Sequence, residues 1–156
     1  MKSKNNILIE KETHTPEETL EFAETLAQKV KAGDVILLHG DLGVGKTVFS
    51  QGFAKGLKIT EPIQSPTFTI LQEYEGGSLP LYHFDVYRIS DPEEMYEIGF
   101  SDYLYGNGVC LIEWASKVEE LLPEEVIEIT IEKNLEKGFD YRKISISYPM
   151  ERNLSF

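Results

Sequence analysis

The sequence predicts an α/β fold: a three-layer sandwich in which a mostly parallel central sheet carries antiparallel additions. Two short runs, 35–38 and 109–112, are wholly apolar, which is typical of strands that are buried on both faces. Segments with helical spacing stand before and after the first run. Near the C-terminus, 127–131 and 144–148 alternate apolar and polar residues, which indicates a closing antiparallel pair.

The first elements are a short strand over 6–10 and a well-marked helix. Thr15 and Glu18 form a capping box, and Pro16 stands at the first helical position. Apolar residues then recur at helical spacing up to Gly33, which is placed to end the helix.

The strand predicted over 34–39 leads through a glycine-rich loop into a helix over 46–57. Apolar side chains form one stripe of this helix. Gly52 and Gly56 weaken it, but they would allow a neighbouring element to pack closely.

The middle of the chain predicts a hairpin and a further helix. Residues 67–74 and 79–88 are expected to form two strands around the turn at 75–78. Another helix is expected over 91–98. After the second apolar strand, Ser116 and Glu119 are expected to form a capping box for a short helix.

Composition supports one ordinary globular domain over 1–156. Of the 156 residues, 41% are hydrophobic and 27% are charged, and no apolar run has the length of a membrane span. The apolar stretch near the N-terminus, 7–9, is too short for a secretory signal. Cys110 is the only cysteine, so we expect no internal disulfide and a cytoplasmic location.

The net charge of −12 opposes binding to phosphate backbones, so we expect no strong direct nucleic-acid binding. The acidic surface either only confers solubility or faces a basic partner, and composition leaves both open.

Residues 40–47 match the pattern G-x-x-x-x-G-K-S/T in full. Glycines let successive backbone N–H groups point at phosphate oxygens, and the following helix presents its positive end to the same anion. The lysine can reach the β- and γ-phosphates, and the threonine hydroxyl can bind Mg²⁺. We therefore predict a P-loop NTPase-like site for ATP and Mg²⁺, with contacts from Asp41, Leu42, Gly43, Val44, Gly45, Lys46, Thr47 and Val48.

Two carboxylates follow predicted strands, where ligands of α/β sheets bind. Asp85 ends the run 81–84, and Glu113 ends the run 109–112. Either one could hold the metal together with Thr47, and the other could orient the attacking water. The alternative for each is an ordinary polar residue that closes a strand.

Several further residues have two interpretations. Ser65-Pro66-Thr67 is either a loop whose hydroxyls sense the γ-phosphate or a plain proline turn. Trp114 packs either on the nucleotide or in the core. We interpret the histidines as structural, since they lack metal-ligand spacing, and Cys110 as inert.

Four motifs occur in one order: the loop of 40–47, Ser-Pro-Thr-Phe at 65–68, His-Phe-Asp-Val-Tyr-Arg at 83–88 and Ile-Glu-Trp at 112–114. In these motifs the chain resembles the TsaE (YjeE) family of bacterial P-loop ATPases, over residues 15–122. The ordered set is far more specific than the phosphate loop alone.

The resemblance implies a role in forming threonylcarbamoyladenosine beside the anticodon of tRNA. It also implies binding to a TsaD–TsaB pair, in which TsaD transfers the threonylcarbamoyl group, and ATP hydrolysis that resets the complex. Because Arg88 is the sole arginine near the motifs, we expect hydrolysis to be slow without these partners. Thr47, Asp85, Glu113 and Trp114 occupy the family's functional positions, which favours the nucleotide role for Trp114.

A small-molecule kinase on the same loop is the main alternative. Such kinases usually clamp charge with several arginines, but the sequence has only Arg88 near the motifs, with Arg142 and Arg152 in the tail. A nucleotide-binding scaffold fits less well, because carboxylates end two strands. A GTPase is disfavoured, since no Asn-Lys-x-Asp motif is present.

Overall fold

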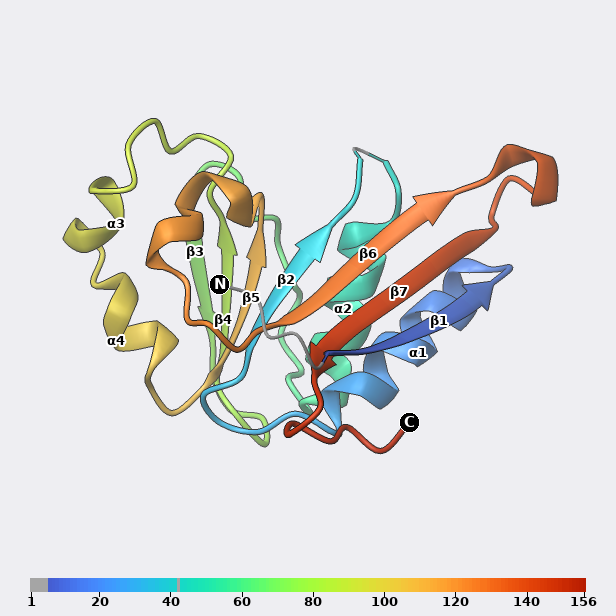
Figure 1. The fold of residues 1–156 in the computed structure, drawn as a ribbon, viewed down its shortest axis with the longest axis horizontal. Coiled ribbons are helices and arrows are strands. Elements are labelled where there is room, and N and C mark those ends of the chain that lie inside the picture. The colour runs from blue at the N-terminus through green and yellow to red at the C-terminus, as the bar shows by residue number, and fades with distance from the viewer. Residues whose placement is uncertain (1–5, 42) are drawn as a thin grey trace.

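The computed structural model describes residues 6–41 and 43–156, and within them seven strands form one sheet. The order across the sheet is β1-β7-β6-β2-β5-β4-β3 (Figure 1). The strands are β1 (Asn6–Thr13), β2 (Val35–His39), β3 (Leu71–Tyr74), β4 (Leu81–Asp85), β5 (Val109–Glu113), β6 (Ile127–Lys133) and β7 (Arg142–Pro149).

The four central strands β6, β2, β5 and β4 run parallel to one another. The outer pairings β1–β7, β6–β7 and β3–β4 are antiparallel. The predicted parallel centre with antiparallel additions is therefore confirmed, although the parallel pairings make up only half of the six.

Helices cover both faces of the sheet, so the three layers are confirmed. They are α1 (Pro16–Ala27), α2 (Lys46–Gly56), α3 (Glu94–Glu97), α4 (Phe100–Leu104) and the 3₁₀ segments η1 (Ala115–Leu121) and η2 (Leu135–Lys137). Ile36 and Leu38 of β2 face the core under α1 and α2. Val35 and Leu37 face the second core, under α3, α4 and η1. In Figure 1, α1 and α2 lie behind the β6–β7–β1 side, and α3 and α4 lie beside β3 and β4.

The two glycines of α2 allow it to pack directly on α1, as predicted. A Cβ on Gly52 would stand 2.2 Å from the backbone oxygen of Leu20, and one on Gly56 would stand 2.3 Å from that of Glu24. Any larger residue would push the two helices apart, so these glycines are needed for packing.

Two predicted helix ends were wrong. Thr15 caps α1 by accepting from the Glu18 N–H at 3.1 Å, but the helix ends at Ala27. Gly33, with φ +90°, instead serves the turn before β2, where its N–H donates to the Gly108 oxygen. Ser116 forms no cap, because η1 already begins at Ala115.

The predicted hairpin exists, but both strands are shorter than expected. Residues 67–70 form a turn instead of a strand, since Ile70 adopts φ +69° and its N–H donates to the Pro66 oxygen. The helix expected over 91–98 shrinks to α3, and α4, which follows it, was not predicted.

Candidate functional site

The glycine-rich loop joins β2 to α2, as the motif requires. Gly43 and Gly45 have φ of +76° and +103°, a left-handed conformation that side chains with a Cβ disfavour. Gly45 is the N-cap of α2, and it supplies no side-chain hydrogen bond to the first turn. The first N–H groups of this 11-residue helix are therefore available to an anion. Leu42, predicted to contact nucleotide, lies outside the described residues.

Side chains of β6 and β7 contact this loop. These strands are far from the loop in the sequence, so the sequence analysis did not predict the contacts. Arg142 donates from Nε to the Val44 oxygen at 2.6 Å, and from Nη1 to the oxygens of Phe139 and Tyr141. The Nζ of Lys133 lies 3.7 Å from the position of a Cβ on Gly43. Arg142, which the sequence analysis placed in the tail, and Lys133 thus both lie against the glycine-rich loop.

The two carboxylates meet at one edge of the sheet. Asp85 and Glu113 are the last residues of β4 and β5, and they are direct partners in the parallel register. Only 4% of Asp85 and 9% of Glu113 is exposed. Burial of two neighbouring carboxylates is unfavourable without compensating partners, so each must be held by hydrogen bonds or cations.

Glu113 contacts two cationic or ionisable side chains. Its Oε1 lies 3.8 Å from Lys46 Nζ, and its Oε2 lies 2.8 Å from His83 Nε2. Lys46 Nζ also lies 4.7 Å from the centre of the Trp114 ring. The loop lysine is therefore buried between a carboxylate and an indole ring.

Asp85 is held by the loop of 65–67. Its Oδ2 accepts from Thr67 Oγ1 at 3.0 Å, and its Oδ1 accepts from the Tyr87 N–H at 3.0 Å. Thr67 Oγ1 in turn lies 2.7 Å from Ser65 Oγ. The loop of 65–67 thus lies directly against the C-terminal end of β4.

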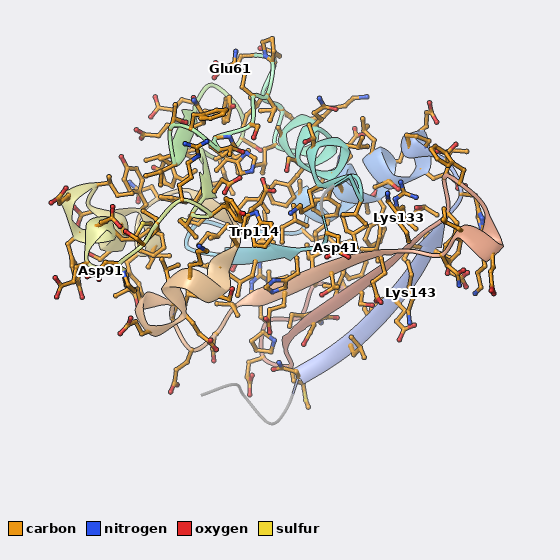
Figure 2. The ribbon with its side chains drawn as sticks, turned by 90° about the horizontal axis from the view of Figure 1, so that it is seen from above. Asp41, Glu61, Asp91, Trp114, Lys133 and Lys143 are labelled. Atoms are coloured by element: carbon orange, nitrogen blue, oxygen red, sulfur yellow. The ribbon has the colours of Figure 1, made fainter. Side chains whose placement is uncertain are left out.

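Two cavities flank the phosphate loop and share Lys46. One has a volume of about 320 Å³; its lining includes Gly43, Gly45, Lys46, Thr47, Val48, Ser65, Thr67, His83, Asp85 and Glu113. The other, about 730 Å³, is lined in part by Asp41, Val44, Trp114, Ile131 and Lys133. Figure 2 labels Asp41, Trp114 and Lys133 along this edge. The predicted site residues that the structure describes therefore divide between two adjoining spaces.

Trp114 is partly buried, and it packs against the second core while it also lines the larger cavity. It has φ +62°, which is a genuine outlier for a bulky side chain, and it directly follows Glu113. Its ring lies 4.9 Å from that of Tyr87, and it borders the larger cavity. Strained backbone of this kind persists where the surroundings enforce it, often at functional sites.

His83, which the sequence analysis interpreted as structural, lies beside the candidate site residues. It is 2% exposed and lines the smaller cavity. The usable signal was its place in the strand: it stands two residues before Asp85, so both side chains point to the same face of β4. Cys110 behaves as expected, since burial raises the pKa of its thiol to about 12.

Among the described residues, no group of three or more His, Cys, Asp or Glu side chains is arranged to hold a metal ion. No helix within 6–41 and 43–156 combines the length and apolar character that a membrane crossing needs.

Comparison with known proteins gives one consistent result. Residues 13–144 match the family described as threonylcarbamoyl adenosine biosynthesis protein TsaE. The chain is 50% identical over 135 residues to the tRNA threonylcarbamoyladenosine biosynthesis protein TsaE of Bacillus subtilis strain 168, covering 86% of this chain and 82% of that protein. The protein of the same description from Treponema pallidum strain Nichols is 41% identical over 119 residues, or 76% of this chain and 87% of that one.

A solved structure is also similar. The crystal structure of YdiB from Bacillus subtilis matches with a TM-score of 0.81 and 43% sequence identity. The match covers 96% of this chain and 91% of that chain.

Proposed function

We propose, because this chain belongs to the TsaE family of tRNA threonylcarbamoyladenosine biosynthesis proteins, that it is a Mg²⁺-dependent P-loop ATPase. Its hydrolysis of ATP would reset a complex of TsaD-like and TsaB-like partners. One observation carries the proposal: the loop residues Lys46 and Thr47 line a single cavity together with the carboxylates of Asp85 and Glu113.

The residues around this cavity fit a triphosphate. The left-handed glycines and the uncapped start of α2 supply N–H donors, and Lys46 supplies a positive charge. Thr47 would hold Mg²⁺, with Asp85 and Glu113 on the same side. When bound, Mg²⁺ would neutralise charge that develops on the phosphates. Since Mg²⁺ usually takes one or two carboxylates plus phosphate oxygens and waters, two carboxylates suffice here.

The chain's own groups would then act in distinct ways. Lys46 would exchange its contact with Glu113 for the phosphates. That would leave one of the two carboxylates able to orient the attacking water and the other to face the ion. The larger cavity would take the base and ribose, with the Trp114 ring on one side.

All three arginine side chains already make contacts within the chain, and this favours an ATPase over a small-molecule kinase. Arg88 stacks on the Phe68 ring, with its Cζ 4.3 Å from the ring centre. Arg142 holds backbone oxygens at the phosphate loop, and Arg152 forms an ion pair with Asp34. The sequence has only these three arginines, so none remains to clamp a second phosphorylated substrate without first losing a contact.

Partners are expected to bring tRNA to this protein. With a net charge of −12, the chain itself opposes a polyanion. We place its action in the cytoplasm, where ATP is available and a lone free thiol is stable.

The test is phosphate release from Mg²⁺–ATP, measured with the chain alone and with a TsaD–TsaB pair. We expect slow release alone and a clear increase with the pair, and no tight tRNA retention by the chain alone in a filter-binding titration at physiological salt. Release that the pair leaves unchanged would contradict the partner role and favour a kinase or an unrelated ATPase. Tight tRNA retention would contradict the charge argument.

A further inference from the structure

His83 is buried beside Glu113 in a way that the fold alone does not explain. Its Nε2 lies 2.8 Å from Glu113 Oε2, whereas its Nδ1 is buried with no hydrogen-bond partner among the described residues. A buried polar atom left unsatisfied costs about 1–3 kcal/mol. An apolar side chain would avoid that cost, so packing alone does not favour histidine here.

The strand register places the two side chains within reach. His83 pairs with Leu111 in the parallel ladder of β4 and β5, and Glu113 stands two residues further along β5. The contact is therefore a diagonal one, which a long carboxylate side chain can make by reaching back along its strand. The same reach turns the other carboxylate oxygen, Oε1, toward Lys46, at 3.8 Å from its Nζ.

We propose that His83 is a positioning residue for Glu113. Its Nε2–H holds Oε2, so that Oε1 faces the phosphate cavity and Lys46. This assignment requires Nε2 to carry the proton while the carboxylate is ionised, which leaves Nδ1 as the unpartnered acceptor. The inference rests on the proposed ATPase function, since it concerns the orientation of a carboxylate in that mechanism.

Loss of this contact would free the carboxylate to rotate. Lys46, Thr47 and the loop N–H groups do not depend on His83, so binding of Mg²⁺–ATP should survive. The chemical step should not, because the proposal takes Glu113 as the carboxylate that orients the attacking water and leaves Asp85 to face the ion. Misplacing a group that acts only in the transition state lowers kcat and leaves KM unchanged. A merely structural role for His83 would instead lower stability without this split.

Two amide substitutions separate the contact from the ring. In His83→Gln the side-chain nitrogen lies as many bonds from Cβ as Nε2 does, so it can still donate to Glu113. In His83→Asn the nitrogen corresponds to Nδ1 and falls short. Both variants remove the imidazole and keep a polar group, so their melting temperatures should be similar.

With the TsaD–TsaB pair present, we expect His83→Asn to lower kcat about tenfold, with KM for Mg²⁺–ATP within about twofold. His83→Gln should remain within about threefold of the unmodified chain. In a Glu113→Gln background, the two His83 variants should have equal kcat, because the group that they orient is already disabled. Equal kcat for the two single variants, or the same loss from His83→Asn in the Glu113→Gln background, would overturn the proposal.

Failure of the proposed function would look different. If the unmodified chain releases no phosphate even with the pair, the ATPase assignment fails, and ¹⁵N NMR of the imidazole then decides the role of His83. We expect a tautomer protonated at Nε2, whose Nε2 resonance moves in Glu113→Gln. Protonation at Nδ1, or a resonance unaffected by Glu113→Gln, would overturn the positioning role.

Discussion

The β1–β7–β6 side of the sheet and the edge that carries the glycine-rich loop differ in backbone regularity and in the kind of side chain that they bury. On the β1–β7–β6 side, buried Ile127, Ile129 and Ile131 alternate with more exposed residues, and β1 pairs with β7 over eight residues without a bulge. At the loop edge, Ile70 and Trp114 adopt positive φ. Ionisable side chains are also buried there, namely Lys46, His83, Asp85 and Glu113.

The difference shows where the chain departs from what is best for folding alone. Positive φ at bulky residues and buried charges are each unfavourable for stability. The loop edge holds two of the four described non-glycine residues with positive φ, Ile70 and Trp114, together with the buried Lys46, Asp85 and Glu113. Natural sequences tolerate such conflicts mainly where function requires them. Substitutions at the loop edge should therefore change turnover more than stability, and substitutions in the β1–β7–β6 sheet should do the reverse.

The largest effect is expected from Lys46→Ala. Removing the charge that faces the phosphates should lower turnover roughly a thousandfold, as loss of a preorganised donor does. Thr47→Ala should also lose turnover, through Mg²⁺. Calorimetric titration with Mg²⁺–ATP, beside the turnover assay, checks both. Lys55→Ala is the matched control, because the Lys55 side chain is 66% exposed on the same helix. Equal affinity and turnover in Lys46→Ala and Lys55→Ala would remove the phosphate site from this loop.

The second-largest loss of turnover is expected from substitution of the two carboxylates. Glu113→Gln and Asp85→Asn keep the shape of each side chain, and a lost transition-state contact of about 3 kcal/mol lowers turnover roughly a hundredfold. Nucleotide binding should persist in at least one of them, and melting temperatures should fall little. The check is phosphate release from Mg²⁺–ATP by each variant, measured with the TsaD–TsaB pair present. Full turnover in both variants would exclude these carboxylates from the chemistry.

Ile146→Ala tests the expectation that substitutions in the β1–β7–β6 sheet change stability more than turnover. Ile146 is fully buried in β7, so its truncation should destabilise the fold by about 3 kcal/mol, and Ile146→Val by about 1 kcal/mol. Denaturant unfolding measures both. Turnover per folded molecule should stay within about twofold of the unmodified chain. A large loss of turnover at unchanged stability would break the separation between the two regions.

Arg142 belongs to β7 but supports the phosphate loop, so it marks the border between the regions. Arg142→Lys keeps the charge and loses the fork that holds Val44 and the two nearby oxygens. We expect Mg²⁺–ATP affinity to fall about tenfold, in line with about 1.5 kcal/mol for a hydrogen bond from a charged group. Unchanged affinity together with lowered stability would assign Arg142 wholly to the scaffold.

The smallest effect concerns Cys110. Burial raises the pKa of its thiol to about 12, so the folded chain keeps it neutral well above the ordinary value of about 8.5. Below about pH 8.5 the thiol is neutral in both states and contributes no pH dependence. As pH rises further, only the unfolded state ionises, so stability should fall more steeply than in Cys110→Ala. Equal slopes in the two proteins would contradict the burial argument.

Local signals predicted the loop between β2 and α2 and the ends of β4 and β5 well, since each of these features depends on residues that are adjacent in the chain. Contacts made across the sheet could not be predicted in this way. Arg142 reaches Val44 from 98 residues away, and His83 reaches Glu113 from 30 residues away. Both depend on strand order, which one sequence leaves open.

The backbone conformation of Trp114 could also not be predicted from the neighbouring sequence. Its positive φ contradicts the preference of a bulky residue, and only the surrounding site enforces it. The Ser116 cap failed for a related reason, because the turn at Trp114 makes that residue the N-cap of η1, two residues earlier than the capping pattern indicated.

The most direct test of the account is a crystal structure of the chain with Mg²⁺ and a non-hydrolysable ATP analogue. We predict the triphosphate against the N–H groups of 43–48 and Lys46, with Mg²⁺ on the Thr47 hydroxyl. Asp85 and Glu113 should both face the ion or the γ-phosphate, and the base should lie beside Trp114. A triphosphate bound outside the loop, or a γ-phosphate turned away from both carboxylates, would contradict the proposed site.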